Sequence, residues 1–214
     1  MSIVLQGSTS GSVTLQEPAV AGTTVLDLPA TSGTVLTSAS AINASSITTG
    51  TLPAARLPAG SVLQVVSTTL QGTFSMSGTS QVAITGLTAT ITPTSASNKI
   101  LVMVTIGGYA QGSGQGRFIL TRAGSTISGA IGTTAGSRLS DTFTVAMGSS
   151  GVTQVTGGIN YLDSPATTSS TTYGLTVSSN DGGQAIYINY SSLDTDNNGA
   201  QRNISTITVM EIVA

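Results

Sequence analysis

The sequence contains no cysteine and no histidine, and these two absences remove most of the usual catalytic and metal-binding chemistry. Without cysteine there are neither disulfides nor thiolate metal sites. Without histidine there are no Ser-His-Asp or Cys-His triads, and the commonest general base is missing. A carboxylate pair would still serve a glycosidase, but the chain has no tryptophan and only 4% aromatic residues to bind sugar rings. We therefore expect a protein that is not an enzyme, with a carboxylate-based glycan hydrolase as a remote alternative.

Charged side chains are also scarce. The 214 residues include 6 basic and 8 acidic ones, or 7% charged, where globular proteins have roughly 25%. The charges are scattered singly, so the sequence offers no basic patch for nucleic acid. No apolar run approaches the roughly 20 residues of a membrane span, and the Met1 end lacks the basic and apolar regions of a signal peptide. We expect neither nucleic-acid binding nor membrane insertion.

The abundant residues favour β structure, because Thr, Val and Ile pack on pleated surfaces while Gly and Asn supply turns. Many short strand-like runs with turn residues between them follow residue 61, a pattern typical of an antiparallel β sandwich or barrel. We predict strands at 62–68, 81–85, 88–92, 99–107, 117–122, 125–130, 139–147, 152–162, 171–178, 184–190 and 204–213. The sequence thus predicts an all-β fold with a self-standing domain at 61–214.

Residues 1–46 form a different kind of segment, an extended β-rich arm. Two glycine-led runs, at 11–18 and 22–29, both end at proline, and a third begins at 33–36. These runs have too little apolar surface to offset the ordering of their backbone, so the arm is not expected to be stable alone. It is either a flexible tail or a segment that intertwines with other copies or docks onto a larger assembly.

Residues 47–60 join the arm to the globule. Two prolines near its end each remove an amide donor and disfavour helix in the preceding residue, so we expect this joint to run extended. Its characteristic residues are Gly50, Leu52, Pro53, Arg56, Leu57 and Pro58.

Alternation along two strands predicts which side chains are buried. In 184–190, Ile186, Ile188 and Tyr190 should face the core while Asn189 points the other way. The last strand has apolar residues on both faces, which indicates that it is covered on both sides, by the core or by another subunit. The residues that we assign to the core or to an oligomer interface are Ile207, Val209, Glu211 and Val213.

Three further patterns were weighed as sites. Asp194, Asp196 and Asn198 reproduce the first half of an EF-hand calcium loop, but the twelfth position is Ser205 and lacks the bidentate glutamate, so calcium competes with an ordinary Asx turn. The glycine-rich run 112–116 precedes a strand rather than a helix, which favours a long hairpin loop over a phosphate site. The tyrosines could stack on sugars if they are exposed near loops; they are Tyr109, Tyr161, Tyr173, Tyr187 and Tyr190.

Two stretches resemble a known family. The run SGSVTLQEPAVAGTTVLDLPATSGTVL is similar to a repeat near the N-termini of tailed-bacteriophage tail-fibre and related virion proteins. The run INASSITTGTLPAARLP resembles the joints between fibre modules. In the globule, the leading strand, a 173–190 hairpin and the closing strand 204–212 are similar to the C-terminal knobs of phage appendages.

This resemblance implies a jelly-roll-like homotrimer, similar to tumour-necrosis-factor folds, with the first and last strands adjacent. It implies a virion protein whose residues 1–60 attach to other virion proteins and whose knob contacts a glycan or protein of the host surface. A capsid decoration protein that clamps the head is the main alternative. An adhesin-like bacterial surface module is another, disfavoured by the missing signal peptide.

Overall fold

The computed structural model describes residues 3–15, 20, 23, 30, 52–53, 56–110, 114–146 and 154–214. The chain divides into two compact units, Met1–Gly50 and Thr51–Ala214. The expected arm lies in the first unit and the expected globule in the second, and the expected joint at 47–60 spans the division between them.

The described part of the first unit is one β-hairpin. β1 (Ile3–Gln6) pairs with β2 (Ser12–Leu15) in antiparallel register, with Ile3 opposite Leu15. Gly11 has a φ of 77°, a conformation that glycine adopts without strain, and its carbonyl accepts a 2.8 Å hydrogen bond from the Gly7 amide. The runs expected at 22–29 and 33–36 lie almost entirely outside the described residues.

A six-stranded antiparallel sheet forms one layer of the second unit. Its strands are β3 (Val62–Leu70), β4 (Phe74–Ser77), β6 (Lys99–Ala110), β10 (Val155–Asp163), β12 (Ala185–Ile188) and β13 (Ser205–Ile212). The long strand β6 lies in the middle. β10 pairs along one of its edges, while β13 and then β12 share the other edge. β3 pairs with β13, so the expected adjacency of the first and last strands is confirmed.

A five-stranded antiparallel sheet forms the other layer. Its strands are β5 (Val82–Ile91), β7 (Gln115–Arg122), β8 (Ser125–Thr126), β9 (Phe143–Ala146) and β11 (Thr171–Ser179). β11 lies between β5 and β7, and the short strands β8 and β9 both pair with β7.

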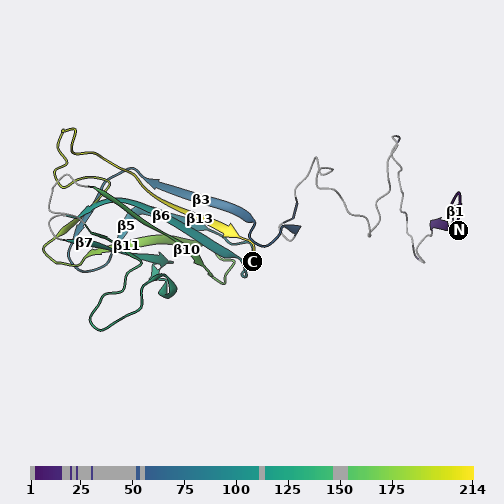
Figure 1. The fold of residues 1–214 in the computed structure, drawn as a ribbon, viewed down its shortest axis with the longest axis horizontal. Coiled ribbons are helices and arrows are strands. Elements are labelled where there is room, and N and C mark those ends of the chain that lie inside the picture. Colours follow the sequence, from purple (N-terminus) through teal and green to yellow (C-terminus); the bar gives the residue numbers. More distant parts are fainter. Residues whose placement is uncertain are drawn as a thin grey trace. The chain divides into compact units, whose positions relative to one another are not determined.

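The inward faces of the two sheets enclose the core, and the predicted all-β sandwich is confirmed (Figure 1). Alternate residues of β6, such as Ile100, Val102 and Ile106, are fully buried, as period-2 patterning requires. The largest buried side chains are Tyr173 and Phe118, and the Phe118 ring stacks on Phe143 with centroids 4.8 Å apart. These aromatic rings fill the space between the layers.

Several local predictions differ from the structure. The strands expected at 81–85 and 88–92 form the single strand β5, in which Gly86 adopts a φ of 83° and the pairing register with β11 shifts. Only Ser125–Thr126 of the expected strand 125–130 pairs as a strand, and a short 3-10 helix, η3, follows at Ser128–Ala130. β4 was not predicted, because four residues give too short an alternation to recognise.

Two expected hairpins are wrong. β11 and β12 belong to different sheets, so the segment between Tyr173 and Tyr190 crosses the sandwich instead of forming a hairpin. β6 and β7 likewise lie in different sheets, so they do not form the expected long hairpin, and Gln115 and Gly116 of the run 112–116 already belong to β7. A hairpin does form at Ala123 and Gly124, which have φ values of 49° and 77° between β7 and β8.

The end of the joint turns instead of running extended. The Arg56 amide donates to the Pro53 carbonyl at 2.9 Å, and the Ser61 amide donates to the Pro58 carbonyl at 3.2 Å. Proline fixes φ near a value that suits turns as well as extended chain, which explains the error. Leu57 lines a hollow of about 480 Å³ together with Leu63 and Val213. The two turns, closed by the Arg56–Pro53 and Ser61–Pro58 hydrogen bonds, therefore accompany the packing of Leu57 against the sandwich.

The strand directions place the connections of the second unit at two opposite ends of the sandwich. At the entry end the chain begins β3 and leaves β13, and Gly60 and Ser61 pair with Val213 through hydrogen bonds of 2.8 and 2.9 Å. The distal end holds the connections β3–β4, β4–β5, β11–β12 and β12–β13. In Figure 1 the distal connections extend on the side of the sandwich away from the label C.

Candidate functional site at the distal end

Four described connections make up what we call the distal loop cluster, residues 71–73, 78–81, 180–184 and 189–204. The longest of them, 189–204, connects β12 to β13. Loops that a rigid scaffold holds at one end of a sandwich are where binding residues are commonly found. We therefore consider first what holds these loops together.

Asn189 connects two of these segments, 189–204 and 71–73, to each other and to strands β3 and β13. Its side chain is fully buried, and its Nδ2 donates to the carbonyls of Leu70 and Gly72, both at 2.8 Å. Its Oδ1 accepts from the Ser205 hydroxyl at 2.6 Å. The prediction that Asn189 points away from the core is wrong, because a φ of 69° turns the chain out of the strand after Ile188.

Gly107 allows the end of β6 to lie close to this network. Its amide donates to the Ser205 hydroxyl at 3.1 Å, and its carbonyl accepts from the Asn189 amide at 2.6 Å. A Cβ at position 107 would lie 2.8 Å from the Cβ of Asn203, so a side chain would not fit. The absence of a side chain here is what permits the buried polar contacts.

The remaining loops of the cluster are also hydrogen-bonded to strands. The Ser179 amide donates to the Gly78 carbonyl at 2.9 Å, and the Gln81 side chain donates to the Ser178 hydroxyl at 2.9 Å. Asn180 accepts from the Gln115 amide through its Oδ1 at 2.8 Å. These hydrogen bonds order loops that have little apolar surface, and the one from the Gln115 amide to the Asn180 side chain is a side-chain to backbone bond.

The tip of 189–204 contains the predicted calcium ligands. Both carboxylate oxygens of Asp194 accept from the Arg202 guanidinium, at 2.7 and 2.9 Å from Nη2, and a β-bridge between Tyr190 and Arg202 closes the loop. Asn197 forms an Asx turn in which its Oδ1 accepts from the Gly199 amide at 2.7 Å. Asp196 and Asn198 are exposed at the tip.

A calcium ion would therefore have to displace Arg202 from Asp194. Among the residues that the structure describes, no group of three or more acidic side chains is placed to hold a metal ion. The contacts at the tip are those of an ordinary Asx turn, which was the alternative to a calcium loop. The calcium site stays a prediction.

The expected sugar-stacking tyrosines have different environments. Tyr187 and Tyr190 lie at the distal end with their rings edge to face and 5.2 Å apart, and both are half-buried. Tyr190 was predicted to be core and is only partly so. Tyr161 is half-buried and Tyr173 is fully buried, while the side chain of Tyr109 lies outside the described residues.

The last strand supplies core residues. Ile207, Val209 and Glu211 are fully buried within one chain, and Val213 is half-buried. The opposite face of β13, which carries Met210, is only half-buried. These residues were predicted to belong either to the core or to an oligomer interface. The burial of Ile207, Val209 and Glu211 within one chain supports the core role.

Glu211 is a buried carboxylate with several donors around it. It accepts from Gln64 Nε2 at 2.6 Å, from the Thr94 amide at 2.6 Å, from the Thr94 hydroxyl at 2.8 Å and from Asn98 Nδ2 at 2.7 Å. Burial alone would raise the pKa of Glu211, but the hydrogen bonds from Asn98, Gln64 and Thr94 outweigh it and hold that pKa below its usual value. The carboxylate ties the β5–β6 connection to the last strand at the entry end.

A second buried acid lies at the edge of the sandwich. Asp163 accepts from the Tyr173 hydroxyl and from Arg122 Nη1, both at 2.7 Å. Burial and the hydrogen bond to Asp163 raise the pKa of Tyr173, and the hydrogen bond to Asp163 raises the pKa of Arg122. Sequence reasoning missed this triad, because its members are far apart in the chain.

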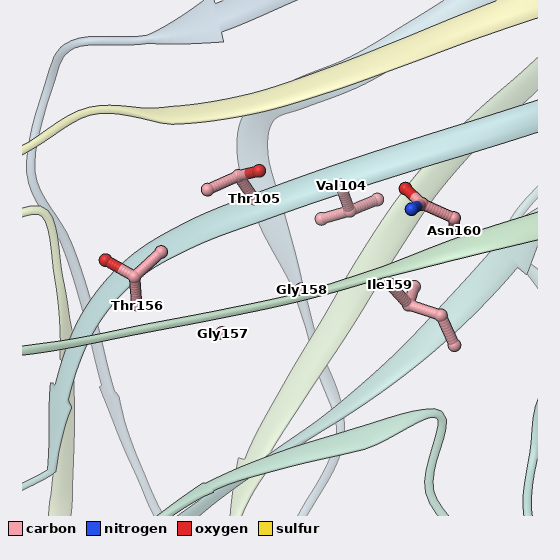
Figure 2. Close-up of a pocket in the computed structure, with 7 residues that line it drawn as sticks. All are labelled: Val104, Thr105, Thr156, Gly157, Gly158, Ile159 and Asn160. Atoms are coloured by element: carbon pink, nitrogen blue, oxygen red, sulfur yellow. The ribbon is translucent and has the colours of Figure 1, made fainter.

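A hollow of about 410 Å³ lies over β6 and β10 (Figure 2). It is lined by Val104, Thr105, Thr156, Gly157, Gly158, Ile159 and Asn160. A Cβ at Gly158 would lie 2.1 Å from the Val104 carbonyl oxygen, and one at Gly157 would lie 2.5 Å from Val145 Cγ2. The two glycines therefore allow β10 to pack closely against β6 and against Val145.

The structure holds no helix that could cross a bilayer within its described part. The sequence matches no protein-family model, and no curated protein is significantly similar to it. A functional assignment therefore has to rest on the sequence patterns and on the geometry described above.

Proposed function

We propose that this chain is a structural virion protein of a tailed bacteriophage, a fibre-like appendage that works as a homotrimer. Residues 1–60 attach it to the particle, and the distal loop cluster contacts the host surface. The observation that carries the proposal is the separation of the two ends of the sandwich. The chain enters and leaves at one end, and the 189–204 connection lies at the other end together with three shorter connections.

The composition of the distal loop cluster suits a carbohydrate or a polar protein surface. Its tip exposes Thr195, Asp196, Asn197 and Asn198, and the Tyr187–Tyr190 ring pair lies at its base. Amide and carboxylate groups offer hydrogen bonds to sugar hydroxyls, and aromatic rings offer a stacking surface. Three such clusters on one trimer would gain avidity although each contact is weak.

Binding of labelled protein to host cells tests this proposal. Asn198→Lys places a bulky charge on the exposed tip and should reduce cell binding at least tenfold, since the multivalent contacts weaken together. Ala96→Lys is the matched control, because position 96 is also exposed but lies at the entry end. Equal binding by the two variants, or no binding by the unmodified protein, would refute a host-contact role for the distal loops.

A further inference from the structure

The tip of the 189–204 connection contains a peptide bond of special chemical reactivity. Asn198 is followed by Gly199, and this is the one Asn-Gly pair in the sequence. The backbone nitrogen of the residue after an asparagine can attack the side-chain Cγ of that asparagine. Glycine favours this attack, because it has no Cβ to hinder the approach and its backbone rotates freely. The sequence therefore makes Asn198 the asparagine of this chain that is most open to such a reaction.

The surroundings of Asn198 also favour the reaction over other asparagines. Its side chain is exposed to water. Asn189, in contrast, is fully buried and is followed by the bulky Tyr190. Asn180 is exposed like Asn198, but an aspartate follows it, and its Oδ1 accepts a 2.8 Å hydrogen bond from the Gln115 amide. Asn180 thus serves as a comparison within the same loop cluster.

Two side chains hold the peptide group between Asn198 and Gly199 at both of its ends. The Gly199 amide donates to Asn197 Oδ1 at 2.7 Å, and the Asn198 carbonyl accepts from Gln201 Nε2 at 3.3 Å. We call these two hydrogen bonds the tip clamp. The Gly199 nitrogen must lose its proton and turn towards the Asn198 side chain before it can attack. Both hydrogen bonds of the tip clamp oppose that movement.

We infer that Asn198 is a site of spontaneous deamidation and that the tip clamp sets the rate of this modification. The Gly199 nitrogen forms a bond to Asn198 Cγ, and the bond between Cγ and Nδ2 breaks. The proton lost by the Gly199 nitrogen leaves with the side-chain nitrogen as ammonia. Water then opens the resulting succinimide ring at one of its two carbonyls and leaves an aspartyl or an isoaspartyl residue. Water is the one co-reactant that the sequence of steps needs.

Either product changes the surface of the distal loop cluster. A negative charge appears at position 198, close in the chain to the exposed Asp196. The isoaspartyl product also lengthens the backbone by the side-chain carbon that enters it. Both changes fall on the tip that the proposed function assigns to host contact. The reaction proceeds in the purified chain, however, so it does not depend on the proposed virion role.

Incubation of the purified full chain in mildly alkaline buffer, followed by peptide mass spectrometry over time, tests the site. Deamidation should accumulate at Asn198 while Asn180 stays intact. The folded protein should react more slowly at Asn198 than the same chain unfolded in urea, where the tip clamp is absent. Deamidation spread evenly over the two asparagines, or an unreactive Asn198 in the unfolded chain, would overturn the assignment of the site.

The variant Asn197→Ala tests the tip clamp. It should deamidate at position 198 about fivefold faster than the unmodified protein, the factor that corresponds to one ordinary hydrogen bond. Thr195→Ala is the matched control, because Thr195 is also exposed at the tip but contacts the Asn197 amide through its backbone carbonyl, which the variant keeps. Equal rates in the two variants would overturn the role of the tip clamp.

The variant Gly199→Ala tests the attacking atom. It should form isoaspartate, detected by enzymatic methylation, about tenfold more slowly, because a methyl group next to the Gly199 nitrogen hinders ring closure. An unchanged rate would show direct attack by water on the side chain and would overturn the succinimide route. Cell binding does not enter any of these measurements, so the proposed host contact stands or falls separately.

Discussion

At the scale of single residues, Glu211 shows how a carboxylate is kept ionised inside a sandwich with few charges. No cation is near it among the hydrogen bonds that the structure shows, and its partners are amides and a hydroxyl from Gln64, Thr94 and Asn98. Of these residues Asn98 is buried and Gln64 is half-buried, so their side-chain amides need an acceptor. The network therefore depends on the carboxylate as much as the carboxylate depends on the network.

Removing this acceptor should be strongly destabilising. Glu211→Ala should lower the free energy of unfolding by about 3 kcal/mol, because four hydrogen-bond donors, among them the buried Asn98, lose their acceptor at once. Thr206→Ala, on the outward face of the same strand, should change it by less than about 0.5 kcal/mol. Denaturant titration of the two variants measures both values, and similar losses would contradict the role given to Glu211.

The same carboxylate should make stability depend on acid. Because the pKa of Glu211 is lower in the folded protein than in the unfolded chain, its contribution is present above the unfolded value, about 4.3, and is lost as the pH falls through the folded value. The free energy of unfolding should therefore decline below about pH 4. Glu211→Gln should flatten this decline in denaturant titrations between pH 2 and 6. A decline of unchanged steepness would assign the acid sensitivity to other groups.

At the scale of elements, alternation in the sequence predicted the buried residues of regular strands and failed where strands end. Ile186, Ile188, Ile207 and Val209 were placed correctly, since period 2 alone decides their side of the sheet. Asn189 was misplaced because its positive φ breaks the alternation.

Turn chemistry likewise showed where the chain reverses but not which sheet it enters next. A hairpin was expected at 173–190, yet the turn between β11 and β12 carries the chain from one sheet to the other. For the same reason, the sequence could not predict which distant residues form hydrogen bonds with each other. Glu211 and Asp163 were visible as single acids, but their donors come from distant elements and only the folded topology brings them together.

β10 provides a prediction at this scale. Gly158→Ala should lower the free energy of unfolding by about 2 kcal/mol or more, because the new methyl group would meet the Val104 carbonyl and force the two strands apart. Gly182→Ala is the control, as nothing lies within 4 Å of a Cβ there. Thermal unfolding compares them. A tolerated Gly158→Ala would mean that β6 and β10 are not held as closely as the structure shows.

At the scale of the whole molecule, the account assigns different tasks to the two units. The second unit has its own core and closes its entry end through the pairing of Gly60 and Ser61 with Val213. A chain shortened to begin at Thr51 should therefore keep the fold and the oligomer of the full chain but no longer join the particle. Circular dichroism and sedimentation check the first expectation, and incorporation into particles checks the second. Incorporation without residues 1–50 would contradict the anchoring role of the arm.

The central claim is that the chain is an appendage whose distal loops reach the host. Electron microscopy of particles of the phage that encodes it, labelled with an antibody against the exposed tip at 195–200, tests this most directly. The account predicts label at the outer end of a tail appendage, together with blocked adsorption to host cells. Label spread over the head would indicate a decoration protein, and particles without label would contradict a virion role.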